Sequence, residues 1–80
     1  MNKTILILGA CGQIGTELTL ALRQKYGNHS VVASDIRQPE HSELLNGPFE
    51  VLDASSASAL RLVCEKHEIH TVYQLVAMLS

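Results

Sequence analysis

Hydrophobic positions along this chain follow two different periods, and glycine or proline residues mark the changes between them. Thr4–Leu8 is a hydrophobic run without alternation, which is typical of a strand buried on both faces of a parallel sheet. From Ile14 the period becomes helical, and Ile14, Leu18, Ala21 and Leu22 fall on one stripe. The whole pattern predicts strands at residues 4–8, 30–35, 49–53 and 71–77, and helices at 14–26 and 55–67.

Capping and turn residues mark the boundaries of these elements. Gly27 is expected to end the first helix, and Ser55 or Ser56 to cap the second. Residues 36–48 are expected to form a loop with one helical turn around 42–45. The polar side of the first helix is expected to carry Glu17, Arg23, Gln24 and Lys25.

The order of the elements predicts the topology of the sheet. Connections between parallel strands are right-handed, which gives the strand order 3-2-1-4 with one helix on each face. The expected fold class is α/β, as the N-terminal half of a Rossmann-type doubly wound parallel sheet. Strand 71–77 then lies at an open hydrophobic edge, which proteins normally cover. We therefore expect residues 1–80 to be one segment of a larger domain.

The amino-acid composition argues against several other classes of protein. With 18% charged residues, a net charge of −2 and no cluster of Lys or Arg, the chain is not expected to bind nucleic acid. Cys11 and Cys64 have no CxxC partner, which argues against a disulfide scaffold or a zinc ribbon. No hydrophobic stretch reaches the roughly 18–20 residues that span a bilayer. Because the first strand also leaves no room for a signal peptide, we expect a cytoplasmic protein with no membrane contact.

Three glycines occupy the turn between the first strand and the first helix. Gly9 permits a tight turn, Gly12 lets phosphates approach the backbone, and Gly15 lets the helix lie close to the strand. The free N–H groups and the positive dipole end of the helix then face an anion. Because Asp35 follows Gly15 by twenty residues, the arrangement predicts a dinucleotide site. The alternative is an ordinary turn with flexible glycines.

Asp35 ends the second strand and points to the identity of the dinucleotide. A carboxylate there accepts from both hydroxyls of the adenosine ribose and repels a 2′-phosphate, so NAD is expected rather than NADP. Arg37 keeps NADP open, because an arginine can hold that phosphate, although stacking on adenine is the favoured role. The other alternative for Asp35 is a solvated acid at a strand end.

Further candidates lie at the same edge of the sheet. Asp53 ends the third strand within reach of adenine, and Ala54 borders the same pocket; Asp53 is otherwise a helix cap or a turn acid. Leu75 and Ala77 are expected to contact the adenosine ribose and the pyrophosphate turn, or else to belong to the core. Ser80 follows the fourth strand, and ligands of such sheets bind beyond the strand ends.

Two weaker features carry alternatives of their own. Cys11 lies at the start of the first helix, a position that lowers the pKa of a thiol, so it is either reactive or simply a small turn residue. His67 and His70 are three residues apart, but no cysteine or acid pair completes a metal site. No metal is therefore expected.

The glycine spacing GxxGxxG resembles that of the extended short-chain dehydrogenase/reductase superfamily, of the NAD-dependent epimerase/dehydratase type. Within it, Gly12–Gly15, Ser34–Arg37 with Pro39, and Tyr73–Ser80 resemble the short-chain-type L-threonine 3-dehydrogenases. The resemblance extends over the whole chain. It implies a Rossmann segment, at residues 1–80, of an enzyme whose substrate domain lies elsewhere.

The resemblance also implies a reaction, in which NAD⁺ oxidises L-threonine to L-2-amino-3-ketobutyrate in a homodimer of the full-length protein. A tyrosine and lysine in a YxxxK motif remove the hydroxyl proton in that family. Neither Tyr26 nor Tyr73 has a lysine four residues later, so no catalytic residue is expected in this chain. Ser80 matches a serine near the amino-acid substrate. The implied NAD contacts are Gly9, Ala10, Cys11, Gly12, Gln13, Ile14, Asp35, Ile36, Arg37, Asp53, Ala54, Leu75 and Ala77.

Three alternatives to threonine oxidation remain open at this point. The same superfamily contains nucleotide-sugar epimerases and dehydratases, which share the cofactor site. It also contains modules that bind NAD without turnover and regulate partners. A structural domain without a ligand is the third, and it leaves the three glycines and Asp35 as a coincidence.

Overall fold

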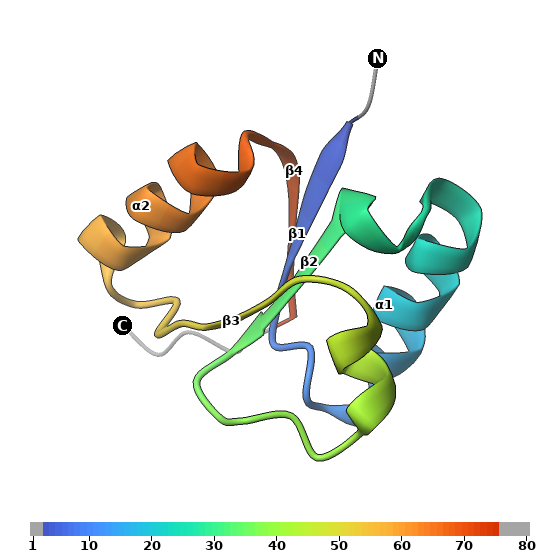
Figure 1. The fold of residues 1–80 in the computed structure, drawn as a ribbon. Helices are drawn as coiled ribbons and strands as arrows, with labels where there is room; N and C mark the ends of the chain where they lie inside the picture. Colours follow the sequence, from blue (N-terminus) through green and yellow to red (C-terminus); the bar gives the residue numbers. More distant parts are fainter. Residues whose placement is uncertain (1–2, 76–80) are drawn as a thin grey trace.

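A computed structural model of the chain describes residues 3–75, which form one parallel sheet with helices on both sides (Figure 1). The sheet has four strands in the order β3-β2-β1-β4. The α/β fold class and the predicted strand order are therefore confirmed. The elements are β1 (Thr4–Leu8), α1 (Gln13–Tyr26), β2 (Val31–Asp35), β3 (Phe49–Val51), α2 (Ala57–His67) and β4 (Ile69–Gln74), with two 3₁₀ helices, η1 (Asn28–Ser30) and η2 (Ser42–Asn46).

The two faces of the sheet carry two separate hydrophobic clusters, and α1 and α2 lie on opposite sides of it (Figure 1). Successive side chains of a strand point to opposite faces. Ile5 and Ile7 of β1 therefore join the cluster under α1 and η2, whereas Leu6 and Leu8 join the cluster under α2. This explains why residues 5–8 of β1 are hydrophobic without alternation.

The buried face of α1 differs from the predicted stripe. Ile14 is 71% exposed, and Ala21 is exposed as well, although both were expected in the core. The fully buried positions are Gly15, Thr16, Thr19 and Arg23. Leu18 and Leu22 of the predicted stripe are partly buried and pack against the cluster under α1. The hydroxyls of Thr16 and Thr19 donate to the backbone carbonyls of Ala10 and Gly15.

Arg23 is a second correction, because the sequence pattern placed it on the polar side of the helix. In the structure Arg23 is only 3% exposed to solvent. Its guanidinium donates to three backbone carbonyls: Nε to Val31 O at 3.1 Å, Nη1 to Leu44 O at 2.6 Å and Nη2 to Pro48 O at 2.7 Å. Burial lowers the pKa of Arg23, and these carbonyl dipoles compensate for the lost hydration of the charge.

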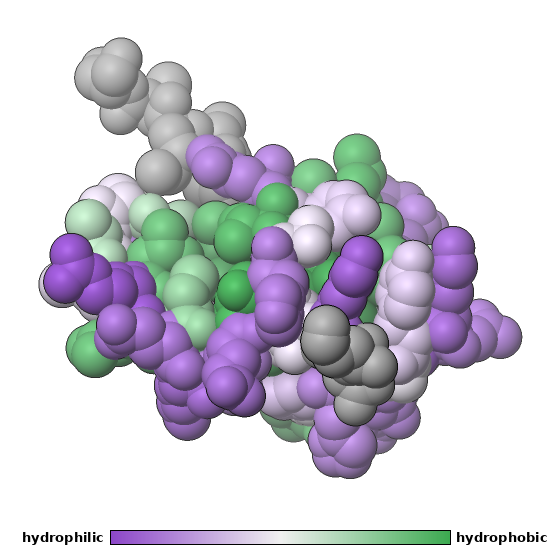
Figure 2. Space-filling view, turned by 90° about the horizontal axis from the view of Figure 1, so that it is seen from above, coloured by the Kyte–Doolittle hydropathy of each residue, from purple (hydrophilic) through white to green (hydrophobic). Residues whose placement is uncertain are grey.

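The strand β4 is an edge of the sheet within the described residues, where it pairs with β1. Its side chains include Val72 and Tyr73, which are 45% and 39% exposed. Figure 2 shows hydrophobic residues at the surface on the side of the molecule where α2 and β4 lie. Within residues 3–75, none of the helices has the length and hydrophobicity needed to cross a membrane.

A polar cluster joins β3 to the last turn of α2. The Glu50 carboxylate lies 2.9 Å from Lys66 Nζ and 2.6 Å from His67 Nε2. Hydrogen bonds from His67 and Lys66 hold the pKa of Glu50 below its usual value of 4.5. Since α2 otherwise contacts the sheet through half-buried residues, this cluster fixes the end of the helix.

We predict that Glu50→Gln lowers the free energy of unfolding at pH 7 by about 0.5–1 kcal/mol, the range for a partly exposed ion pair. A lowered pKa stabilises the fold above the ordinary value of 4.5, and this contribution disappears as the pH falls through the folded-state value. The difference between variant and wild type should therefore vanish in acid. Denaturant unfolding at pH 3–7 measures it, with the exposed Glu65→Gln as the control. A pH-independent difference would contradict the assignment.

Candidate functional site

The turn after β1 is held against the end of the neighbouring strand. The N–H groups of Gly9 and Ala10 both donate to the carbonyl of Ser34 in β2, at 3.0 and 2.9 Å. Gly9 has φ +93°, a backbone conformation that favours glycine. The chain can therefore leave the strand, cross toward β2 and enter α1 within four residues.

Gly12 and Gly15 have different surroundings. A Cβ at Gly15 would collide with the carbonyl oxygen of Gly9 and lie 2.8 Å from the Cα of Ala10, so only glycine permits this contact of helix and strand. A Cβ at Gly12 would meet only Gly9 O, at 3.9 Å, and would otherwise point into open space. Gly15 is therefore a contact point of the fold, whereas Gly12 borders free volume.

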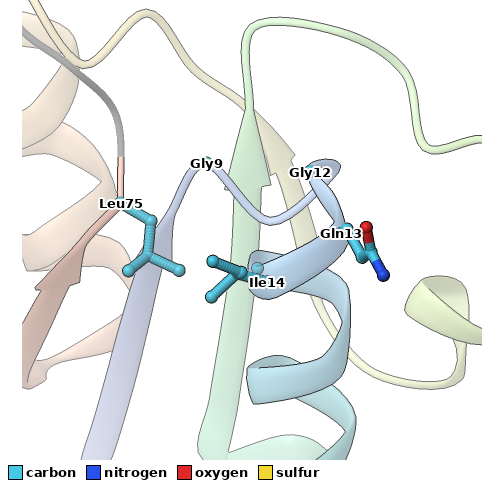
Figure 3. Close-up of a pocket in the computed structure, with 6 residues that line it drawn as sticks. Gly9, Gly12, Gln13, Ile14 and Leu75 are labelled. Atoms are coloured by element: carbon cyan, nitrogen blue, oxygen red, sulfur yellow. The ribbon is translucent and has the colours of Figure 1, made fainter.

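That free volume is an open hollow of about 390 Å³ at the start of α1. Figure 3 shows the side chains of Ile14 and Leu75 pointing toward one another across it, while Gln13 points away. The first N–H groups of a helix have no partner inside it. No side chain of the described residues caps α1, and its first turn holds no acid. The residues present therefore suit a diphosphate, which needs N–H donors and no bulky side chain.

Asp35 lies beside the glycine turn. Its Oδ2 accepts from the backbone N–H of Cys11 at 3.0 Å, and its Oδ1 accepts from the N–H of Arg37 at 3.2 Å. Arg37 Nε is 3.8 Å from the same Oδ1. The carboxylate is thus oriented by backbone groups at the carboxyl end of β2. No local pattern predicts the contact with Cys11, because the two residues are 24 positions apart in the sequence.

The hypothesis of a reactive Cys11 is wrong. Burial and the neighbouring charge of Asp35 raise the pKa of the thiol, and these effects exceed the opposite effect of Arg37. The Sγ atom lies 3.8 Å from the carbonyl oxygens of both Arg37 and Gln38, and the side chain packs against the cluster under α1. Cys11 is a small residue that joins the turn to the segment after β2.

The other predicted residues lie along the same edge of the sheet. Asp53 follows β3, and its Oδ1 accepts from the N–H and hydroxyl of Ser55, which lowers its pKa. Ser56, rather than Ser55, caps α2. Ala54 packs against the cluster under α2, and Ile36 is exposed beside Asp35. Leu75 donates from its N–H to Leu8 O at 2.9 Å. Ala77 and Ser80 lie outside the described residues.

Comparison with protein families identifies the class. Residues 5–80 match the NAD dependent epimerase/dehydratase family, and the chain belongs to this family. The resemblance noted in the sequence and the prediction of NAD as the cofactor are both confirmed.

Individual relatives are much longer than this chain. A protein of Staphylococcus haemolyticus named uncharacterized epimerase/dehydratase is 49% identical over 98% of this chain, which spans 25% of that relative. The solved L-threonine dehydrogenase from Clostridium difficile is 40% identical with a TM-score of 0.88, over 98% of this chain and 25% of that one. The holo form of L-threonine dehydrogenase from Cupriavidus necator is 45% identical with a TM-score of 0.83. This match covers 96% of this chain and 25% of the Cupriavidus chain.

We predict that Asp35→Asn lowers the pKa of Cys11, because a negative charge beside the thiol is removed. Alkylation of Cys11 by iodoacetamide at pH 8 should then be faster in the variant than in the wild type, because a larger share of the thiol is ionised. Mass spectrometry of the Cys11 peptide measures the rate, with Cys64 as the internal reference. Glu43→Gln, which removes an exposed charge elsewhere, should leave the rate unchanged. A wild-type Cys11 already fully reactive at pH 7 would overturn the interpretation.

Proposed function

We propose that this chain is the NAD-binding segment of a longer NAD-dependent L-threonine 3-dehydrogenase. The observation that carries the proposal is the uncapped start of α1, which opens on the hollow and lies next to the oriented Asp35 carboxylate. The identity of 40% and 45% to two solved L-threonine dehydrogenases supports the substrate. The exposed edge β4 supports a domain that continues beyond these residues.

In this proposal the glycine turn holds the diphosphate of NAD. Gly9, Gly12 and the first N–H groups of α1, at Gln13 and Ile14, face the phosphates, with Ala10 and Cys11 completing the turn. An approaching phosphate meets no side chain at Gly12. The positive end of the helix dipole contributes there, because the first turn of α1 carries no acid.

The adenosine end of NAD is proposed to lie at the ends of β2 and β3. The Asp35 carboxylate accepts from the ribose hydroxyls, and Ile36 and Arg37 border the adenine. Asp53 and Ala54 form the far wall of the adenine pocket. Leu75 and Ala77 are proposed to contact the ribose and the diphosphate turn, and Ser80 the substrate.

Bound NAD⁺ supplies the hydride acceptor for oxidation of a hydroxyl group. We assign no catalytic residue to this chain, since Tyr26 and Tyr73 lack a lysine four residues later. The residues here bind and orient the cofactor, whereas proton removal belongs to the rest of the protein. We further propose that the full-length protein is a cytoplasmic homodimer.

We predict that the full-length protein reduces NAD⁺ when L-threonine is added, with absorbance at 340 nm as the readout and 2-amino-3-ketobutyrate as the product. D-threonine and L-serine serve as matched substrates, and NADP⁺ should be a poorer acceptor because Asp35 repels its 2′-phosphate. Conversion of a nucleotide sugar without net NAD⁺ reduction would instead favour an epimerase or dehydratase, as the family name allows. NAD⁺ binding without any turnover would favour a regulatory module.

A second prediction concerns the diphosphate position. Gly12→Val places a branched side chain in the open space before α1, so binding of NAD⁺ should fall at least about a hundredfold, through loss of phosphate contacts. The fold should persist, because no atom of the described residues blocks that space. Calorimetric titration and circular dichroism measure both properties.

Gly15→Ala is the matched comparison for Gly12→Val. Its methyl group collides with the Gly9 carbonyl, so the expected loss is one of stability, of about 1–3 kcal/mol. Unchanged NAD⁺ affinity in Gly12→Val would contradict the assignment of the diphosphate site.

A further inference from the structure

The connection from β2 to β3 contains little regular structure. It runs from residue 36 to residue 48, and the 3₁₀ helix η2 (Ser42–Asn46) is its regular part. A helix in this place would satisfy most of its own carbonyl groups. Here the carbonyls of Leu44 and Pro48 accept from the buried guanidinium of Arg23 instead. Arg23 therefore replaces hydrogen bonds that a helical connection would have made internally.

The surroundings of Arg23 are fitted to this role. Among the described residues no carboxylate forms an ion pair with it, so its charge is held by carbonyl dipoles alone. Gly47 leaves room for the guanidinium: a Cβ there would lie 2.8 Å from both Cζ and Nε of Arg23 and would collide with the carbonyl of Asn28. The segment and the side chain fit together only with glycine at this position.

The same segment reaches the cofactor edge at its other end. Residues 36–38 follow Asp35, and the thiol of Cys11 lies 3.8 Å from the carbonyls of Arg37 and Gln38. Leu44 is fully buried in the cluster that Cys11 packs against. The segment is thus held near its start by Cys11, beside the glycine turn, and near its end by Arg23 together with the N–H of Ala33, which donates to Pro48 O at 3.0 Å.

We propose that Arg23 is a positioning residue for the adenosine end of the cofactor site, and that it acts through the segment 36–48 on Asp35. Its contacts with Leu44 and Pro48 hold the far end of the segment. This keeps the near end, at residues 36–38, in the position where the Arg37 N–H orients the Asp35 carboxylate. The inference rests on the proposed function, because it takes Asp35 as the ribose contact.

The test is a double-mutant cycle on the full-length protein, with the dissociation constant of NAD⁺ measured by calorimetry well below the unfolding temperature. Arg23→Lys keeps the charge but cannot reach all three carbonyls. We expect the dissociation constant to rise about tenfold, the effect of losing one hydrogen bond to a charged group. In an Asp35→Asn background, where the charged acceptor is already absent, Arg23→Lys should change the dissociation constant less than twofold.

A purely structural role of Arg23 would lower the unfolding temperature and leave the dissociation constant of NAD⁺ unchanged, or would give additive effects in the cycle. Either result overturns the inference. Arg23→Gln, which keeps an amide donor without leaving a buried charge, should reproduce the selective loss and covers the case in which Arg23→Lys does not fold. Lys25→Met removes an exposed charge from the same helix end and should have no effect. A wild-type protein that does not bind NAD⁺ would contradict the proposed function itself.

Discussion

The contact between Gly15 and the Gly9 carbonyl fixes the geometry on which the rest of the site depends. Any side chain at Gly15 would push α1 away from β1. Because the helix starts so close to the strand, its free N–H groups lie beside the ends of β1 and β4, where the hollow opens. Near this contact the buried positions of the helix are Thr16 and Thr19, whose hydroxyls donate to the carbonyls of Ala10 and Gly15 at 2.8 and 2.7 Å.

Polar anchors lie away from this site, around the opposite ends of the strands. Arg23 joins the end of α1 to the start of β2 and to the residue before β3. Glu50 joins β3 to the last turn of α2 through Lys66 and His67. A small hydrophobic core leaves helix ends weakly held, and directional hydrogen bonds to backbone or charged groups fix them. The polar anchors that stabilise the fold thus lie away from the hollow, which lets the binding edge remain open.

The sequence predicted the elements that depend on local pattern. Residues 5–8 and 31–33 are hydrophobic because both faces of the sheet are covered, and that pattern is visible without a structure. The hydrophobic pattern failed where a contact between residues far apart in the sequence decides which side chains are buried. Ile14 lies at a helical position typical of a core residue, yet the close approach at Gly15 turns that side outward. Arg23 follows Thr19 by four residues and Gly15 by eight, so all three lie on the buried face of the helix. The sequence pattern nevertheless assigned Arg23 to the polar surface, because its side chain is charged.

The surroundings of Cys11 show how the charge of Asp35 acts on both the glycine turn and the segment after β2. A thiol at a helix start is expected to ionise readily, yet burial of the thiol and the charge of Asp35 beside it raise its pKa. A protonated thiol can donate to a carbonyl, whereas a thiolate would be repelled by the carbonyl oxygens of Arg37 and Gln38 that lie 3.8 Å away. The carboxylate that suits a ribose with two free hydroxyls therefore also favours the neutral form of Cys11, as burial does. That neutrality lets the glycine turn and the segment after β2 stay together at the rim of the proposed adenosine site.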